Sequence, residues 1–211
     1  MIKILLIILT FSFNFVAYAQ NGYNTYEVDS FIDEMYQKHN YNKKDLRELF
    51  SKIKEKKQLK KFFKKAPERR LTWNGCSPDE KQCINYKGLF VNEYNIDNGI
   101  KYIKENSHLL EKASKRFGVP KEIITAIIGI ETRYGKNLGT FKTFDTLASL
   151  SVGPNKGRRA KFYRTELENF LLLCRENSLD PNLIKGSYAG ALGKPQFISS
   201  SYRTYAIDFD G

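Results

Sequence analysis

The sequence predicts a mainly α-helical protein, and two observations support this. In several long stretches apolar residues recur three and four positions apart, as they do on one face of an amphipathic helix. No long stretch alternates between apolar and polar residues, as a half-buried strand does. We therefore expect helices packed on helices, joined by irregular segments.

Residues 1–19 have the layout of a secretory signal peptide. Lys3 precedes an uncharged run that begins at Ile4 and ends in the small residues Ala17-Tyr-Ala19. The run is short for a membrane-spanning helix, which needs about 20 apolar residues, and polar sequence follows it directly. No cysteine stands beside the small residues to carry a lipid. We expect cleavage after Ala19 and a soluble, exported, periplasmic protein.

Residues 20–65 are predicted to form a small helical N-terminal region. Asp29 or Ser30 is placed to cap a first helix and Asn42 a second, each followed by apolar residues at helical spacing. Residues 66–96 mix proline, glycine, asparagine and charged residues without a sustained period. This composition predicts an irregular linker or lobe.

Residues 97–211 are expected to form the main helical core. A helix that starts near Asp97 is predicted to end at Gly118, because glycine commonly terminates helices. Pro120 suits the first turn of the next helix, which is predicted to continue to Gly135. This second helix is rich in isoleucine, so we expect it to be central to the core.

Two later stretches, residues 143–151 and 158–177, also have helical periodicity. Cys174 lies in the second and is predicted to be a buried, small apolar side chain rather than a nucleophile. Cys76 and Cys83 flank a polar, turn-rich segment. A disulfide between them and a pair of free thiols are both compatible with the sequence of an exported protein.

The formal net charge of +12 predicts an anionic partner. Nucleic acid is the usual partner of so basic a chain, but the export signal argues against it. The two histidines, His39 and His108, are far apart in the sequence and show neither metal-ligand spacing nor a histidine-based triad. We expect no cofactor and no metal.

Glu131 is the candidate catalytic residue. It follows Ile124, Ile127 and Ile128 by seven, four and three positions, a spacing that predicts a carboxyl group on the buried face of a helix. Burial favours the protonated form of a carboxyl group, as does the carbonyl end of a helix. Both effects suit a general acid. A structural glutamate, paired with a cation or exposed by a bend, is the alternative that the local sequence leaves open.

The run from Phe117 to Gly135, FGVPKEIITAIIGIETRYG, closely resembles the active-site helix of the lytic murein transglycosylase B family, glycoside hydrolase family 103. The resemblance continues through residues 143–151, the Arg158-Arg159 pair and residues 183–202. It implies a lysozyme-like helical fold and a partner in the glycan strands of peptidoglycan. It also implies that Glu131 acts as the single general acid and base of a lytic transglycosylase, which leaves 1,6-anhydro-N-acetylmuramic acid ends.

The same resemblance implies a set of substrate-binding residues. The Ser187 hydroxyl would orient Glu131 or an N-acetyl group of the substrate, although tight packing is another explanation for the glycines around it. The remaining side chains would line the glycan cleft or bind carboxylates of peptidoglycan: Tyr86, Arg158, Arg159, Gln196 and Phe197. Tyr86 stands in a context that departs from the family's usual Trp-x-x-Tyr, and the two arginines have a solvated helix start as their alternative.

Alternatives to the transglycosylase follow from Asp145 and from the last residues. Asp145 is a candidate second carboxylate for a water-using muramidase, but we favour a capping role at the start of the helix at 143–151. Asp208 and Asp210 resemble the beginning of a calcium loop whose other ligands are absent from the sequence. Members of the family continue beyond the equivalent of Gly211. We therefore expect the C-terminal part of the core to be missing, and a non-catalytic peptidoglycan-binding remnant is the third hypothesis.

Overall fold

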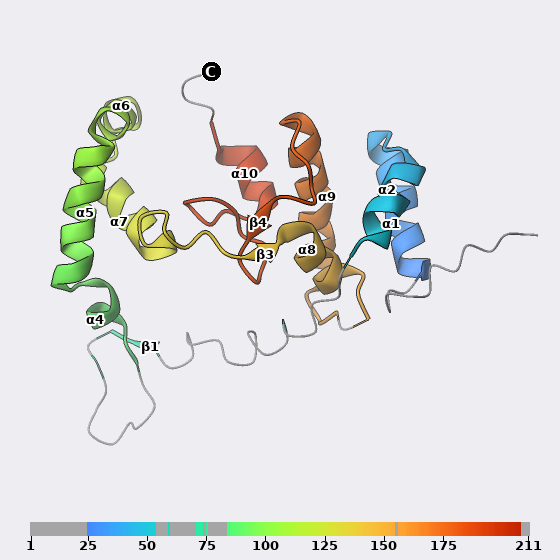
Figure 1. Ribbon diagram of the computed structural model, residues 1–211, viewed down its shortest axis with the longest axis horizontal. Coiled ribbons are helices and arrows are strands. Elements are labelled where there is room, and N and C mark those ends of the chain that lie inside the picture. The colour runs from blue at the N-terminus through green and yellow to red at the C-terminus, as the bar shows by residue number, and fades with distance from the viewer. Residues whose placement is uncertain are drawn as a thin grey trace, which may run out of the picture.

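The computed structural model describes residues 25–53, 59, 71–73, 75, 84–154 and 156–207. Helices dominate this part of the chain, which confirms the predicted mainly α class (Figure 1). The predictions for residues 1–19, for the Cys76–Cys83 pair and for Asp208 and Asp210 lie outside the described residues. No helix in the described ranges has the length and apolar character needed to span a bilayer.

The elements that position the candidate site are short and follow one another closely. The described helices are α1 (Thr25–His39), α2 (Lys43–Ser51), α4 (Tyr86–Phe90), α5 (Glu93–Glu105), α6 (Ser107–Phe117), α7 (Lys121–Thr132), α8 (Thr143–Ser151), α9 (Ala160–Glu176) and α10 (Ser199–Tyr205). Strand β1 (Leu71–Thr72) pairs in parallel with β2 (Ile84–Asn85), and β3 (Phe141–Lys142) pairs antiparallel with β4 (Lys185–Gly186). The strands are two residues long, so they join segments rather than build a layer.

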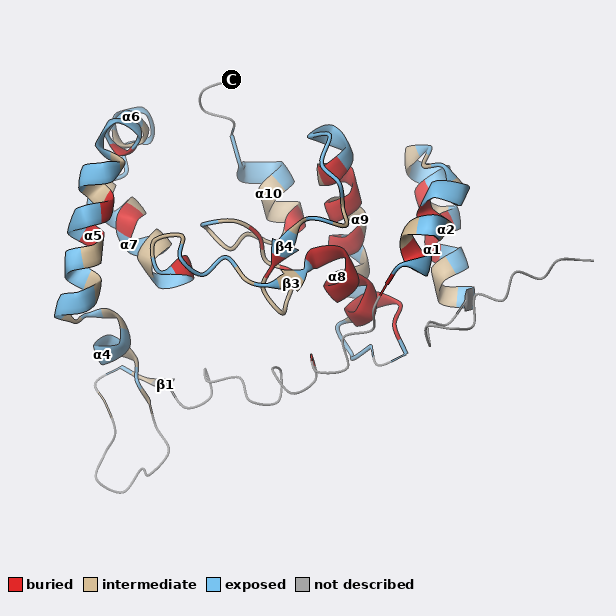
Figure 2. Cartoon of the chain, viewed as in Figure 1, coloured by how far each residue is buried: buried red, intermediate tan, exposed pale blue. Residues whose placement is uncertain are grey.

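The core lies around α8, in which every residue is buried (Figure 2). Helix α9 packs on α8 and contributes Leu167 and Phe170, both fully buried. The N-terminal helices add Phe31 and Phe50, and the Phe50 ring meets Phe144 of α8 edge-on, with 5.2 Å between centroids. Burying a side chain of this size contributes about 1.5–3 kcal/mol, so this cluster supplies much of the stability.

A second group of helices, α4 to α7, lies on the opposite side of α8–α10 from α1 and α2 (Figure 1). The prediction that α7 is central to the core is wrong. Its Ile123, Ile127 and Ile130 are 52%, 51% and 43% exposed, whereas its buried residues are Thr125 and Thr132. The reason is that α7 packs against α5 and α6 on one side, and its isoleucines extend around the other faces.

Several predicted helix ends are confirmed because they depend on local capping. The Asn42 side chain accepts a hydrogen bond from the Lys44 amide at the start of α2. Gly118 ends α6 in the left-handed conformation, with φ of 68°. Helix α8 spans the predicted residues 143–151, and α9 lies within the predicted 158–177.

Other predicted boundaries are wrong. Helix α1 begins at Thr25, before Asp29 and Ser30, and Glu27 in its first turn suits the positive end of the helix dipole. The predicted helix from Asp97 to Gly118 is two helices. They are separated at Asn106, whose side chain bonds to the Tyr102 carbonyl oxygen and competes with the helical backbone. Residues 84–96, predicted to be irregular, contain β2, α4 and the start of α5.

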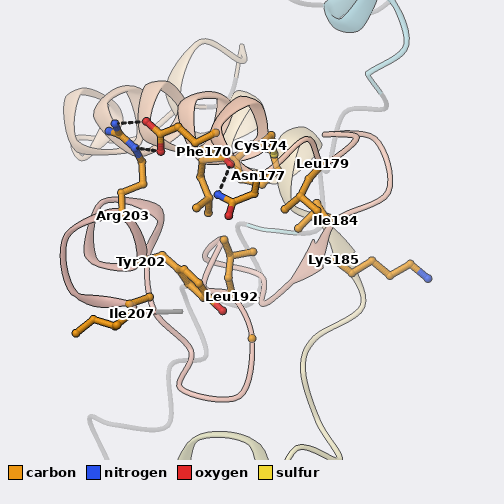
Figure 3. A pocket seen from close by; sticks show the side chains of 14 residues that line it. Phe170, Cys174, Asn177, Leu179, Ile184, Lys185, Leu192, Tyr202, Arg203 and Ile207 are labelled. Atoms are coloured by element: carbon orange, nitrogen blue, oxygen red, sulfur yellow. Dashed lines mark hydrogen bonds and ion pairs between the residues drawn. The ribbon is translucent and has the colours of Figure 1, made fainter. Parts of the chain in front are cut away.

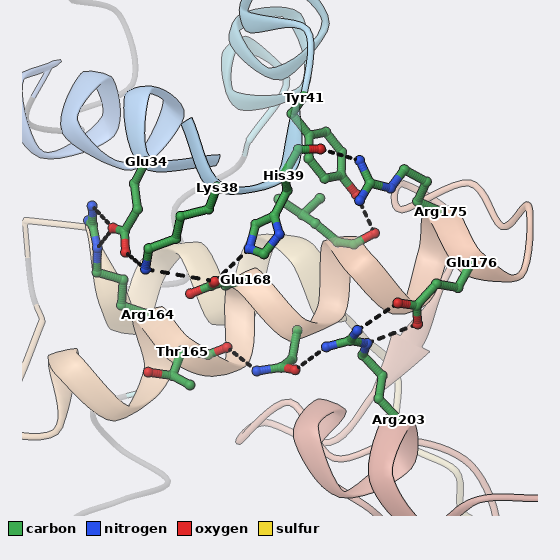
Figure 4. A network of polar contacts seen from close by, with 12 residues as sticks. Glu34, Lys38, His39, Tyr41, Arg164, Thr165, Glu168, Arg175, Glu176 and Arg203 are labelled. Carbon is green, nitrogen blue, oxygen red and sulfur yellow. Dashed lines mark hydrogen bonds and ion pairs between the residues drawn. The ribbon is translucent and has the colours of Figure 1, made fainter. Parts of the chain in front are cut away.

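Polar contacts attach α1 to α9 (Figure 4). Arg164 donates two hydrogen bonds to one carboxylate oxygen of Glu34, at 3.0 and 2.8 Å. His39, which the sequence showed without a partner, lies with Nε2 2.7 Å from a carboxylate oxygen of Glu168. Tyr41 donates to a backbone carbonyl of α9 at 2.6 Å. These contacts fix the N-terminal helices on the core.

We predict that the Glu34 carboxylate stabilises the fold in a pH-dependent way. Partial burial alone would raise the pKa of Glu34, but hydrogen bonds from Lys38 and Arg164 outweigh it and lower the pKa below its ordinary value. Its contribution is therefore present at neutral pH and is lost as the pH falls through the lowered pKa. Glu34→Gln should reduce the free energy of unfolding by about 1 kcal/mol at pH 7. Urea unfolding followed by circular dichroism measures this.

The difference between Glu34→Gln and the unsubstituted protein should shrink as the pH falls from about 4.5 through the lowered pKa of Glu34, because both side chains are neutral below it. Glu48→Gln is a matched control, because the exposed Glu48 pairs with Lys52 at the end of its own helix and so joins no two elements. A loss of stability that is the same at pH 7 and pH 3 would show that Glu34 acts through shape rather than charge.

Candidate functional site

Glu131 lies in the last turn of α7, and its side chain is exposed. The predicted position near the carbonyl end of the helix is confirmed. The predicted burial of the carboxyl group is wrong, because the face of α7 that carries Glu131 and Ile127 is itself exposed. Glu131 is therefore accessible to a large ligand.

An unusual turn follows Glu131. Arg133, Tyr134 and Gly135 all have positive φ angles, of 50°, 61° and 83°, so α7 ends three residues before the predicted Gly135. Left-handed conformations cost energy in residues other than glycine and persist where other contacts hold them. Here the Tyr134 hydroxyl donates to the Asn95 carbonyl oxygen at 2.7 Å. The Tyr134 ring lies over Gly129, where a Cβ atom would come within 2.7 Å of the ring.

Thr132 connects the end of α7 to the segment before α10. Its buried hydroxyl lies 3.1 Å from the carbonyl oxygens of both Ile128 and Lys194, and it accepts a hydrogen bond from the Gly135 amide at 3.0 Å. The Lys194 ammonium group reaches back to the hydroxyl of Tyr102 on α5 at 3.4 Å. These bonds fix the residue adjacent to Glu131 against the loop formed by residues 187–197.

The loop at 187–197 carries three predicted site residues. The Ser187 hydroxyl oxygen accepts hydrogen bonds from the amides of Ala189 and Ala191, at 3.3 and 3.0 Å, which leaves its proton for another acceptor. Gln196 has a positive φ of 51° and donates from its side chain to the Gly193 carbonyl oxygen at 2.9 Å. Phe197 is half-buried and pairs with Leu192 through the backbone. Ser187 alone among the three has its side chain positioned chiefly by main-chain amides.

Close backbone contacts explain two glycines near Ser187. A Cβ atom on Gly139 would lie 2.0 Å from the Gly186 carbonyl oxygen, and one on Gly186 would lie 2.3 Å from the Ala191 carbonyl oxygen. Packing within the chain therefore requires both glycines. This agrees with the tight packing that the sequence analysis gave as an explanation for the glycines around Ser187. The contacts place β4 and the Ser187 loop directly against the segment that leaves α7.

The other charged candidates lie in or before helices other than α7. Asp145 is buried in the first turn of α8 and is not its N-cap, which is Lys142, so the predicted capping position is wrong by three residues. A carboxylate in the first turn still interacts favourably with the helix dipole. Arg158 and Arg159 are exposed before α9, and the Arg159 guanidinium lies over the ring of Phe162, 4.4 Å from its centroid.

Tyr86 begins α4, and its ring contacts Trp73 and Phe90. Within the described part of the chain, no hydrogen bond or ion pair joins Glu131 to the other six predicted site residues. Thr132, the residue after Glu131, bonds to Lys194 in the loop at 187–197. Of the six, only Ser187, Gln196 and Phe197 belong to that loop. The sequence analysis missed Thr132, Tyr134 and Lys194, because their roles depend on contacts between segments far apart in the chain.

A pocket of about 690 Å³ lies between α9, α10 and residues 184–193, and none of the predicted site residues lines it (Figure 3). Its one acidic residue, Glu176, accepts two hydrogen bonds from Arg203, at 2.9 and 2.6 Å. The Arg203 guanidinium lowers the pKa of Glu176, so this carboxylate is ill suited to donate a proton. Among the described residues, no three acidic, histidine or cysteine side chains gather as metal ligands.

Comparison with known proteins places the chain in a family. Residues 24–211 match the model of the transglycosylase SLT domain. The membrane-bound lytic murein transglycosylase B of Escherichia coli (strain K12) is 37% identical over 190 residues, which are 89% of this chain and 51% of that protein. The chain therefore spans about half the length of the curated relative that it matches.

Solved structures agree with this match. The soluble lytic transglycosylase SltB1 from Pseudomonas aeruginosa superimposes with a TM-score of 0.76 at 37% identity, covering 87% of this chain and 58% of that one. The Escherichia coli lytic transglycosylase SLT35 in complex with bulgecin A gives 0.77 at 36% identity, covering 92% and 57%. The resemblance inferred from the sequence and the expected lysozyme-like helical fold are thus confirmed, and the chain belongs to the transglycosylase SLT domain family.

Proposed function

We propose that this chain is an exported, periplasmic lytic transglycosylase that cleaves peptidoglycan, with Glu131 as its general acid and base. The observation that carries the proposal is the arrangement at the end of α7, where an exposed carboxyl group precedes a turn fixed by Thr132 and Tyr134. The relatives at 36–37% identity are themselves named as lytic transglycosylases.

The proposed reaction needs one carboxyl group. Glu131 donates its proton to the oxygen between N-acetylmuramic acid and N-acetylglucosamine, and the bond from that oxygen to C1 breaks. The resulting carboxylate accepts the proton of the muramic C6 hydroxyl as that oxygen bonds to C1, which closes the 1,6-anhydro ring and restores the acid. A strand lying over the exposed face of α7 would exclude water from the carboxyl group, and this favours the internal hydroxyl as nucleophile.

The other predicted residues are proposed to bind the strand. Ser187 has a hydroxyl proton available for an acetamido oxygen or for Glu131, and Gln196 and Phe197 belong to the same loop. Arg158 and Arg159 are exposed and so are accessible to carboxylates of the lactyl groups or stem peptides. Tyr86 would cover a sugar face. Buried Asp145 is less suited than an exposed carboxylate to activate water, so the muramidase is the second choice.

We predict that Glu131→Gln abolishes release of muropeptides from purified sacculi. The amide cannot donate the proton to the leaving oxygen, and the loss of a general acid lowers rates by about 10²–10⁴-fold. Mass spectrometry of the released products identifies the reaction, because anhydro products are one water lighter than hydrolytic ones. Glu122→Gln, at an exposed glutamate in the first turn of the same helix, is the control and should retain activity.

The products separate the competing hypotheses. Anhydro products that depend on Glu131 support the transglycosylase. Reducing-end products would replace it with the muramidase and direct attention to Asp145. A folded protein that binds sacculi and releases nothing would identify a non-catalytic binding module.

We predict that Thr132→Val lowers the rate of sacculus lysis while Thr132→Ser does not. Valine fills the same buried space but loses the bonds to Lys194 and Gly135, so Glu131 shifts relative to the loop at 187–197. A displacement of this kind costs up to about 100-fold in rate. Turbidity of a sacculus suspension gives the rate, and thermal unfolding shows that both variants are folded. Equal activity of the two variants would mean that this connection does not position Glu131.

A further inference from the structure

Glu166 of α9 is a buried carboxylate that the proposed reaction does not use. The residue is 3% exposed, and no ion pair joins it to another described residue. One of its oxygens accepts a hydrogen bond from the Ser200 amide at 2.9 Å, and the other accepts one from the Ser200 hydroxyl at 2.8 Å. Burying a carboxylate without such bonds is costly, so the contact with Ser200 fixes the two side chains in one arrangement.

This contact caps the start of α10 from another helix. Ile198 occupies the N-cap position of α10, and no side chain makes a capping hydrogen bond from there. A serine or aspartate at an N-cap accepts a hydrogen bond from the amide of the second or third helical residue. Ser200 is the second residue of α10, so Glu166 supplies that acceptor from α9. Its negative charge also lies at the positive end of the helix dipole.

Helix α10 in turn supports the loop at 187–197. The Tyr202 ring of α10 meets the Phe197 ring edge-on, with 6.2 Å between centroids and 80° between the ring planes. A Cβ atom on Gly193 would lie 3.4 Å from the Tyr202 hydroxyl oxygen. Tyr202 therefore packs against residues on both sides of Gln196. A displacement of α10 would move this part of the loop with it.

We propose that Glu166 is a positioning residue for substrate binding: by capping α10 it holds Gln196 and Phe197 in place for the glycan strand. The proposal rests on the proposed function for its substrate. Glu166 itself is buried and touches neither the strand nor a reacting atom. Because the loop is proposed to bind and Glu131 to carry out the chemistry, loss of Glu166 weakens binding rather than turnover of the bound strand.

Kinetics on sacculi test the proposal. Glu166→Met fills a similar volume but removes both acceptor oxygens. We expect the half-saturating concentration of sacculi to rise about tenfold, as for the loss of one hydrogen bond to a charged group, while the maximal rate is unchanged. Glu166→Gln keeps one acceptor oxygen and should give an intermediate value. Turbidity measured over a range of sacculus concentrations gives both constants.

Arg203→Met is the matched control. Arg203 also joins α10 to α9, through two hydrogen bonds to Glu176, but it does so from the last turn of α10 (Figure 4). Its loss should lower the thermal stability and leave the half-saturating concentration unchanged. An equal rise in both methionine variants would reduce Glu166 to a general contact between the two helices. A lower maximal rate with an unchanged half-saturating concentration in Glu166→Met would also contradict the proposal.

Hydrogen exchange tests the same connection without turnover. The amides of Leu192 and Phe197 each bond to the other residue's carbonyl oxygen, at 2.8 and 3.1 Å, so their exchange reports opening of the loop. Followed by NMR, both amides should exchange faster in Glu166→Met and not in Arg203→Met. Unchanged exchange in Glu166→Met would overturn the proposal. If thermal unfolding shows that this variant is not folded, Glu166→Gln and Ser200→Ala decide in its place, since each weakens the contact without removing it.

The two proposals fail in different ways. If no anhydro products form, hydrogen exchange still decides whether Glu166 holds the loop. If anhydro products form while the exchange and the half-saturating concentration are unchanged in the Glu166 variants, the transglycosylase stands and the positioning role of Glu166 falls.

Discussion

The buried hydrogen bond between the Thr132 hydroxyl and the Lys194 carbonyl oxygen is the contact on which the arrangement of the candidate site depends. One partner is the residue after Glu131, and the other belongs to the loop that carries Ser187 and Gln196. That loop is in turn held by the pairing of β3 with β4 and by the backbone approach at Gly139 and Gly186. The exposed carboxyl group is therefore connected through short, directional contacts to the most buried helix, α8.

Those features of the fold that depend on neighbouring residues could be predicted from the sequence. Helical periodicity identified α8 and α9, and Asn42 and Gly118 marked helix ends because the cap lies within the same few residues. The end of α7 could not be predicted in the same way. Arg133 and Tyr134 adopt left-handed conformations only because Tyr134 bonds to Asn95 of another helix, and nothing in the local sequence reveals that bond.

The position of Glu131 was predictable, but its environment was not. The spacing from Ile124, Ile127 and Ile128 predicted a buried face, yet α7 has isoleucines on several faces, so periodicity did not distinguish inside from outside. The structure buries Thr125 and Thr132 instead, because α5 and α6 pack on that side. An open apolar face next to an exposed carboxyl group suits a site that receives a long polymer, where the ligand itself supplies the covering.

The aromatic contact between Trp73 and Tyr86 shows how a segment without periodicity can still be structured. Residues 66–96 were predicted to be an irregular lobe because the sequence has no sustained period there, yet their described part contains α4 and the pairing of β1 with β2, which involves two residues in each strand. That short pairing nevertheless brings Trp73 against Tyr86, thirteen positions later in the sequence. Tyr86 departs from the family's Trp-x-x-Tyr context, and the structure places an indole ring beside it from a different direction. The spacing of a local motif therefore does not reveal which aromatic rings the fold brings together.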